Sequence, residues 1–191
     1  MIRFFDIAFS LFGLCLLSPF FAIISILIKI DSAGPVFYRQ LRVGKGGIDF
    51  YLFKFRSMFV ESEKKGLLTV GARDTRITPF GYFIRKYKLD ELPQLYNVLV
   101  GEMSLVGPRP ELRKYVDLYS FEEREVLSIR PGITDNASIL FKNENELLGK
   151  VKNSEEYYIK TIMPEKIKLN MLYIKDQSIY QYFRIIFKTI F

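Results

Sequence analysis

The stretch Lys88-Leu89-Asp90-Glu91-Leu92-Pro93-Gln94-Leu95 places two adjacent carboxylates at the start of an expected helix. Apolar side chains with the spacing of one helical face occur at Leu92, Leu95, Tyr96 and Leu99. A helix tolerates proline in its first turn, so Pro93 predicts that Asp90 and Glu91 lie at the helix N-terminus. The helix dipole and the unpaired N–H groups there favour carboxylate anions and also phosphate. Because most acidic pairs at helix starts are solvated capping charges, the surrounding residues decide whether this pair forms a site.

Basic residues precede the acidic pair. Thr78-Pro79 has the cap and the first-turn proline of a short helix that we expect to end near Lys86. This helix would bring Arg85, Lys86 and Lys88 next to the two carboxylates. Nearby cations lower carboxylate pKa values and attract polyanions. We therefore expect lowered pKa values at the pair and a phosphorylated substrate.

The composition restricts the chemistry. The chain has 191 residues and a net charge of +7, which favours an anionic partner such as nucleic acid, a membrane surface or a phosphorylated substrate. It contains no histidine, which excludes a Ser-His-Asp triad and histidine-bound metals. Its only cysteine, Cys15, lies in an apolar run, which excludes internal disulfides and thiolate zinc sites. Any bound metal would be a hard, oxygen-liganded ion such as Mg²⁺.

A long apolar run lies near the N-terminus. Residues 7–28 carry no charge, and as a straight helix they would cover about 33 Å, against a hydrocarbon core of roughly 30 Å. Ser18-Pro19 interrupts the run, and an interior proline bends a helix. Arg3 and Lys29 make both flanks basic, so the charges do not favour opposite sides for the two ends. We therefore expect a re-entrant helix that breaks at Ser18-Pro19 and returns to the same membrane face.

A turn-rich segment at residues 31–35 predicts a domain boundary, with a re-entrant membrane helix over 1–31 and a cytoplasmic catalytic domain over 32–191. Residues 36–43 and 48–55 have the pattern of two strands joined by a glycine-rich hairpin loop.

Two cations interrupt the aromatic side chains at the end of the second strand. Lys54 and Arg56 alternate, so they lie on one face of that strand. Solvated edge charges and a phosphate-facing pair remain equally open.

Gly107-Pro108-Arg109-Pro110 clamps one arginine between two prolines. A guanidinium held in a rigid turn can bind phosphate oxygens through two parallel hydrogen bonds with little loss of entropy. We therefore include Arg109 in the substrate site, together with its neighbours Pro108 and Pro110. Arg130-Pro131-Gly132-Ile133-Thr134 is a second, less specific stiff turn with a cation.

The C-terminal residues predict two further helices, 167–175 and 179–191. The second carries an apolar stripe, for which core packing and docking at the bilayer interface both remain open. The sequence thus predicts an α/β fold: a small mixed α/β catalytic domain with an N-terminal re-entrant (broken) membrane helix and interfacial amphipathic helices.

Together these motifs resemble the bacterial sugar transferases of the monotopic phosphoglycosyl transferase type. The resemblance covers nearly the whole chain and rests on the broken apolar helix and on five motifs in the same order. These are Pro35-Val36-Phe37-Tyr38-Arg39-Gln40, Lys54-Phe55-Arg56-Ser57-Met58, Leu89-Asp90-Glu91-Leu92-Pro93-Gln94, Gly107-Pro108-Arg109-Pro110 and Arg130-Pro131-Gly132-Ile133-Thr134.

The resemblance implies transfer of a sugar-1-phosphate from a UDP-sugar to undecaprenyl or another polyprenyl phosphate, with release of UMP. It implies that Asp90 is the nucleophile of a covalent aspartyl-phosphosugar intermediate and that Asp90 and Glu91 hold Mg²⁺. Arg109 would stabilise the phosphoryl group, with Lys54, Arg56 and Arg85 as further phosphate contacts. The implied location is the cytoplasmic face of the bacterial inner membrane, in contact with its lipids, without a nucleic-acid partner. A monomer and a homodimer both remain open.

The chain departs from the family pattern twice. Asp135-Asn136-Ala137-Ser138 stands where many relatives have Gly-Trp-Ala-Gln, and Tyr182 stands where many have aspartate. The departures leave the identity of the sugar and of the glycan open, together with the roles of Asn136 and Tyr182. A competing hypothesis is a non-catalytic, membrane-anchored basic module that binds anionic lipid or nucleic acid; it explains the charge but not the acidic pair.

Overall fold

The computed structural model describes residues 1–62 and 74–190 as a mixed fold of helices and short strands. The strands are β1 (Phe37–Val43), β2 (Asp49–Phe55), β3 (Ser104–Val106) and β4 (Gly132–Thr134). The longer helices are α1 (Ile2–Asp31), α2 (Pro79–Lys86), α3 (Gln94–Val100), α8 (Met163–Lys175) and α9 (Ile179–Ile190). The shorter helices are α4 (Arg113–Val116), α5 (Asn136–Leu140), α6 (Glu144–Gly149) and α7 (Ser154–Tyr157). Single turns of other helix types are η1 (Lys45–Gly47), η3 (Leu89–Glu91), η4 (Glu123–Ser128) and the π-helical η5 (Tyr158–Ile162).

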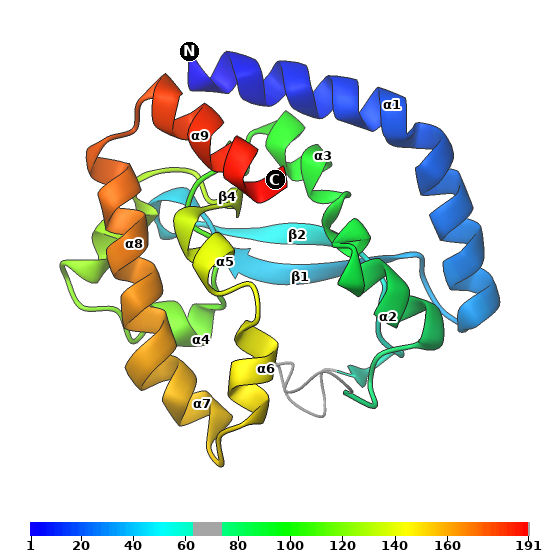
Figure 1. Cartoon of the computed structure of the whole chain (residues 1–191). Coiled ribbons are helices and arrows are strands. Elements are labelled where there is room, and N and C mark those ends of the chain that lie inside the picture. The colour runs from blue at the N-terminus through cyan, green and yellow to red at the C-terminus, as the bar shows by residue number, and fades with distance from the viewer. Residues whose placement is uncertain (63–73, 191) are drawn as a thin grey trace.

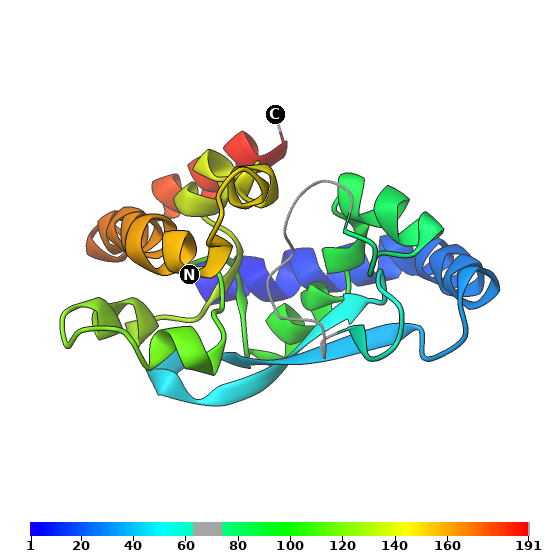
Figure 2. The ribbon, with the colours of Figure 1, turned by 90° about the horizontal axis from the view of Figure 1, so that it is seen from below.

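The predicted hairpin is confirmed. Strands β1 and β2 pair antiparallel, with Tyr38 opposite Lys54. The loop between them needs glycine, because Gly46 and Gly47 have φ of +67° and +77°. The hairpin lies along one face of the molecule and the helices are stacked over its other face (Figure 2).

The acidic pair lies one turn further from the helix than expected. Asp90 and Glu91 belong to η3, and α3 begins at Gln94 with Pro93 as its cap residue. The predicted apolar face is correct only in part: Leu92, Leu95 and Leu99 are half-buried, but Tyr96 is exposed. The fully buried side chains of α3 are Gln94, Asn97 and Val98.

Hydrogen bonding to β2 explains this orientation of α3. The Asn97 amide accepts a hydrogen bond from the Phe53 backbone N–H at 3.0 Å and donates one to the Tyr51 carbonyl at 2.8 Å. The amide pairs with backbone groups of β2 that an apolar side chain at this position would leave without a hydrogen-bond partner.

Helix α1 runs along one side of the molecule and bends near its middle (Figure 1). Pro19 lies inside the helix, and the Ser18 hydroxyl donates to the Cys15 carbonyl at 2.9 Å. A proline of this kind removes one backbone hydrogen bond, and a neighbouring serine can satisfy a carbonyl that is left over. The helix is therefore bent at the predicted position and is not interrupted.

Both halves of α1 contact the rest of the protein. Ile24 and Ile28 in the second half pack against Phe55 and Ile84 in one core cluster. In the first half, the buried Asp6 carboxylate accepts hydrogen bonds from the hydroxyls of Ser104 and Tyr182, at 3.0 and 2.9 Å. Tyr182, which departs from the family pattern, thus connects α9 to α1.

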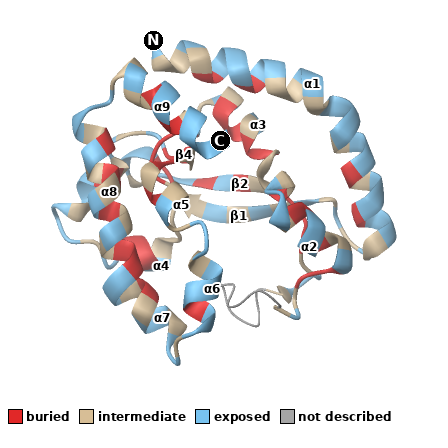
Figure 3. Ribbon diagram, viewed as in Figure 1, coloured by how far each residue is buried: buried red, intermediate tan, exposed pale blue. Residues whose placement is uncertain are grey.

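The remaining surface of α1 is largely exposed and apolar (Figure 3). The helix is long and apolar enough to cross a membrane, and only 11% of its most apolar window is buried within the protein. The core helix of a soluble protein would be mostly covered, so this helix indicates association with a membrane.

Candidate active site

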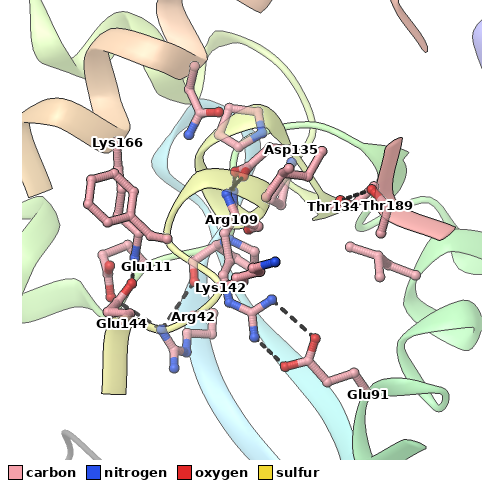
Figure 4. Close-up of a pocket in the computed structure, with 18 of the residues that line it drawn as sticks. Arg42, Glu91, Arg109, Glu111, Thr134, Asp135, Lys142, Glu144, Lys166 and Thr189 are labelled. Atoms are coloured by element: carbon pink, nitrogen blue, oxygen red, sulfur yellow. Dashed lines mark hydrogen bonds and ion pairs between the residues drawn. The ribbon is translucent and has the colours of Figure 1, made fainter. Parts of the chain in front are cut away.

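A cavity of about 980 Å³ opens between η3, the ends of β3 and β4, and the C-terminal helices. Its lining includes Asp90 and Glu91 from η3, Lys54 from β2 and Arg109 from the loop after β3. Figure 4 shows Glu91 and Arg109 facing each other in this cavity. The volume is near the upper end of the range of roughly 300–1,000 Å³ that is typical of ligand pockets. The structure thus brings together residues that are 55 positions apart in the chain, from Lys54 to Arg109.

Glu91 is paired with two cations. The Arg109 guanidinium donates to both Glu91 carboxylate oxygens, through Nη1 at 3.1 Å and through Nη2 (Figure 4). Lys54 Nζ donates to Glu91 Oε1 at 3.0 Å. Burial alone would raise the pKa of Glu91, but the charges of Arg109 and Lys54 and the Arg109 hydrogen bond hold this pKa well below its usual value. Glu91 therefore holds two cations, Arg109 and Lys54, at the cavity.

Asp90 has a different environment. It is 5% exposed, and its Oδ1 has no hydrogen-bond partner among the described residues. Burial raises the pKa of Asp90 above its usual value, although the charges of Lys54 and Arg85 oppose this. The expectation of a lowered carboxylate pKa is thus correct for Glu91 and wrong for Asp90. A desolvated carboxylate with an unpartnered oxygen is suited to act as a nucleophile or a cation ligand.

The two proline-containing turns lie side by side because β3 and β4 pair in parallel. Gly107 N–H donates to the Thr134 carbonyl at 3.0 Å, and Gly132 N–H donates to the Pro108 carbonyl at 2.9 Å. The backbones are so close that a Cβ on Gly132 would lie 2.1 Å from Gly107 N. The close contact fixes the position of the turn that carries Arg109.

Asp135 completes this arrangement through a contact that the sequence did not reveal. It directly follows β4, is 1% exposed, and accepts a hydrogen bond from the Arg109 backbone N–H at 2.8 Å. Its other oxygen accepts from Ser138 N–H and caps α5. The capping pattern of an aspartate ahead of a short helix was visible in the sequence, but its second bond, to Arg109, was not.

We expect Asp135→Ala to lower kcat about 10- to 100-fold, because it frees the backbone of the turn that aims Arg109. Asp135→Asn keeps an acceptor oxygen and should recover most of this loss. The measurement is steady-state turnover with thermal unfolding as the folding control, and Asp117→Ala, at an exposed aspartate, is the matched control. Turnover of Asp135→Ala within threefold of the wild type would show that Asp135 only caps α5.

The other predicted site residues divide into two groups. Arg85, Pro108 and Pro110 line the cavity. Arg56 instead donates from its terminal nitrogens to the carbonyls of Ile28, Ser32 and Ala33, at 3.3, 2.6 and 2.8 Å.

These bonds assign Arg56 a structural contact that the sequence did not predict. The guanidinium binds one carbonyl in the last turn of α1 and two carbonyls just after it, and so connects the end of α1 to the end of β2.

The acidic side chains at this site suit a hard cation that takes only one or two of its ligands from the protein. No group of three or more acidic, cysteine or histidine side chains gathers within residues 1–62 and 74–190. Asp90 and Glu91 are adjacent, and Asp90 Oδ1 is available, whereas Glu91 would have to give up part of its pairing with Arg109 and Lys54 to bind an ion. Mg²⁺ is commonly held by one or two carboxylates together with substrate phosphates and water.

Comparisons with known proteins agree with this geometry. A family model described as bacterial sugar transferase matches residues 1–191. The chain is 40% identical over 190 residues to a UDP-N-acetylgalactosamine-undecaprenyl-phosphate N-acetylgalactosaminephosphotransferase of Aeromonas hydrophila, covering 97% of this chain and 41% of that protein. It is 37% identical over 190 residues to a UDP-glucose:undecaprenyl-phosphate glucose-1-phosphate transferase of Klebsiella pneumoniae, covering 97% of this chain and 38% of that protein.

A shorter relative is a putative undecaprenyl-phosphate N-acetylgalactosaminyl 1-phosphate transferase of Bacillus subtilis. It is 48% identical over 120 residues, which cover 63% of this chain and 67% of that protein. The chain therefore spans about two fifths of the length of the Aeromonas and Klebsiella relatives. With its bent apolar helix, its acidic pair and a family match over its whole length, the chain belongs to the bacterial sugar transferase family.

Proposed function

We propose that this protein transfers a sugar-1-phosphate from a UDP-sugar to undecaprenyl phosphate through a covalent aspartyl-phosphosugar on Asp90. The observation that carries the proposal is a buried carboxylate with an unpartnered oxygen, surrounded by cations in a cavity large enough for a nucleotide sugar. The names of the Aeromonas and Klebsiella relatives support undecaprenyl phosphate as the acceptor and a UDP-sugar as the donor.

In the first step, an Asp90 carboxylate oxygen attacks the sugar-bearing phosphorus. The bond from that phosphorus to the bridging oxygen breaks, and UMP leaves with this oxygen and its electron pair. In the second step, a phosphate oxygen of the lipid attacks the same phosphorus, and the electron pair of the acyl phosphate bond returns to Asp90. Dividing one transfer into two steps is covalent catalysis, and aspartate is an established nucleophile for phosphoryl groups.

The surrounding residues stabilise charge during both steps. Arg109, held by Glu91 and by Asp135, faces the phosphoryl oxygens with a fixed guanidinium. Lys54 and Arg85 add positive charge to the same part of the cavity. When bound by Asp90 and Glu91, Mg²⁺ would neutralise the diphosphate and stabilise the leaving group.

The test is to incubate the purified protein with Mg²⁺, undecaprenyl phosphate and a panel of UDP-sugars, and to follow UMP. We expect UMP release with at least one donor and its loss when EDTA removes the metal. Absence of UMP with every donor would contradict the proposal and favour the non-catalytic membrane module.

We further propose that α1 is re-entrant and that residues 32–191 lie on the cytoplasmic face of the inner membrane. Arg3, at the start of α1, donates to the carbonyls of Val98 and Leu99 at 2.6 and 2.9 Å. At the other end, Arg56 caps the helix. A helix of 30 residues would be about 45 Å long if straight, and this helix bends and is bonded at both ends to the same globular part. Exposed apolar side chains of α9, including Phe187 and Ile190, support contact of α9 with the bilayer interface.

The topology gives a direct prediction. In a Cys15→Ser background, a cysteine added ahead of Met1 and a cysteine at Ala33, an exposed position, should react with a membrane-impermeant maleimide from the same side. The measurement uses right-side-out and inverted vesicles in parallel. Labelling of the two cysteines from opposite sides would contradict the re-entrant helix.

A further inference from the structure

A second cavity, of about 310 Å³, meets the first at the candidate nucleophile. The first cavity and the second share four lining residues: Arg42, Lys54, Arg85 and Asp90. The three cations and the carboxylate thus lie at a junction, where a phosphate group can be reached from both sides. Beyond the junction the two linings have no residue in common.

The chemistry of the proposed reaction, on which this inference rests, assigns ligands to the two sides. Attacking and leaving oxygens lie roughly in line at a transferring phosphoryl group. UMP therefore leaves from the side opposite Asp90, and the lipid phosphate must enter from that same side to displace Asp90. UMP and the lipid phosphate therefore occupy the same space one after the other. The sugar stays in its own position through both steps.

The first cavity has the properties required of the space that UMP leaves and the lipid phosphate enters. It is about three times larger than the second and contains cationic side chains such as Lys142 and Lys188. One wall consists of apolar residues of α3 and α9, among them Leu95, Ile186 and Ile190. These helices adjoin α1: Leu95 reaches Gly13, and Phe183 of α9 packs against Phe5. A lipid chain can therefore arrive from the membrane helix along this wall.

The second cavity differs in its lining chemistry. Tyr38 and Gln40 come from the inward face of β1, and Ser57 follows β2; these side chains offer hydroxyl and amide groups. Phe37 and Phe59 add aromatic surface. The lining also contains charged side chains, so its wall combines aromatic faces with polar and charged groups that can contact the ring and the hydroxyls of a sugar. These charged residues are Arg42, Lys54, Arg56, Glu61, Arg76, Arg85 and Asp90.

Arg56 adds a buried donor to this wall. It is 5% exposed, and its Nε has no hydrogen-bond partner among the described residues. Its terminal nitrogens donate to Ser32 and Ala33 at the end of α1, so Arg56 is a fixed cation in the wall of this cavity.

We propose that the second cavity is the sugar subsite: it holds the single pyranose ring of the donor while UMP and the lipid phosphate exchange in the first cavity. A volume of about 310 Å³ lies at the lower limit of ligand pockets, roughly 300 Å³, and suits one ring. A nucleotide would not fit beside it. Tyr38 and Ser57 then determine which sugar is accepted, because a site that hydrogen-bonds a particular hydroxyl of its ligand rejects an analogue that lacks this group.

Binding to the Asp90→Asn protein tests this assignment without turnover. Isothermal titration calorimetry gives the Kd of UDP and the Kd of the UDP-sugar, using UDP-glucose and UDP-N-acetylgalactosamine as probes. The ratio of the Kd values reports what the sugar contributes to binding. Tyr38→Phe and Ser57→Ala each remove one hydroxyl from the second cavity, and Thr134→Val is the matched removal of a hydroxyl from the first.

We expect Tyr38→Phe and Ser57→Ala to reduce the sugar contribution, each by about three- to tenfold, with the Kd of UDP unchanged. Thr134→Val should leave the sugar contribution unchanged. The inference is overturned if neither second-cavity variant changes the ratio, if both weaken UDP in parallel, or if the sugar adds nothing to binding in the parent protein. UMP release by the wild-type protein is measured separately, so its absence would contradict the transferase proposal and not the sugar subsite alone.

Discussion

Replacement of Asp90 by asparagine should reduce UMP release by about 10⁴-fold or more, which is the scale of losing a covalent nucleophile. Asparagine has the same shape but cannot form the acyl phosphate. The side chain is 5% exposed and burial raises its pKa, so removal of its charge should not destabilise the fold. Thermal unfolding checks the fold, and UMP release is measured at saturating donor and acceptor.

The first half-reaction separates the two roles that Asp90 could have. Without lipid, the wild-type protein should exchange radiolabelled UMP into the UDP-sugar, and Asp90→Asn should show no exchange. A residue that only held the metal would recover exchange at high Mg²⁺ concentration. Exchange by Asp90→Asn at a rate close to that of the wild type would remove Asp90 as the nucleophile.

Replacement of Arg109 by lysine should lower kcat about 10²- to 10³-fold, comparable to loss of one donor that stabilises a transition state. Lysine keeps the charge but loses the planar pair of donors that now contacts both oxygens of Glu91. Loss of the Arg109 guanidinium would leave Glu91 with Lys54 as its cationic partner and would change the position of the Lys54 side chain. The measurement is kcat and KM for the donor.

The matched control is Arg113→Lys. Arg113 also pairs with a carboxylate, at Asp49, but it is 42% exposed at the side chain and does not line the first cavity. A double-mutant cycle with Glu91→Gln tests the coupling, since residues that act as one unit give losses far from additive. Additive effects, or a change in KM alone, would contradict a role for Arg109 in stabilising the reacting phosphoryl group.

Local patterns account for the parts of the structure that the sequence predicted. The hairpin strands, the Thr78 cap of α2 and the C-terminal helix α9 depend on alternation, capping and helical periodicity, which are properties of residues close in sequence. The grouping of Asp90, Glu91 and Arg109 was predictable for a different reason. All three residue types suit the binding and transfer of phosphate groups, and the turn at Arg109 is rigid. Their roles in the reaction remain predictions.

Contacts between distant segments account for what the sequence did not reveal. Arg56 lies on the predicted strand face, but its use as a cap depends on where α1 ends, 25 residues earlier. Asn97 and Gln94 are polar, yet α3 buries them, and the Asn97 amide hydrogen-bonds to the backbone of β2. A period of 3.6 identifies a helix but not which partner it meets.

Asp135 and Tyr182 illustrate the same limit at positions that depart from the family pattern. Asp135 fixes the backbone of Arg109, 26 residues earlier, and Tyr182 reaches Asp6, 176 residues earlier. Neither partner can be read from local sequence. Both bonds use buried oxygens whose loss would leave donors unpaired.

The most direct test of the account is the intact mass of the protein after incubation with Mg²⁺ and its UDP-sugar, without lipid. We predict a mass increase equal to one sugar-1-phosphate group, located on Asp90 by peptide analysis and lost when undecaprenyl phosphate is added. Turnover without this adduct, or an adduct on any residue other than Asp90, would contradict the covalent mechanism.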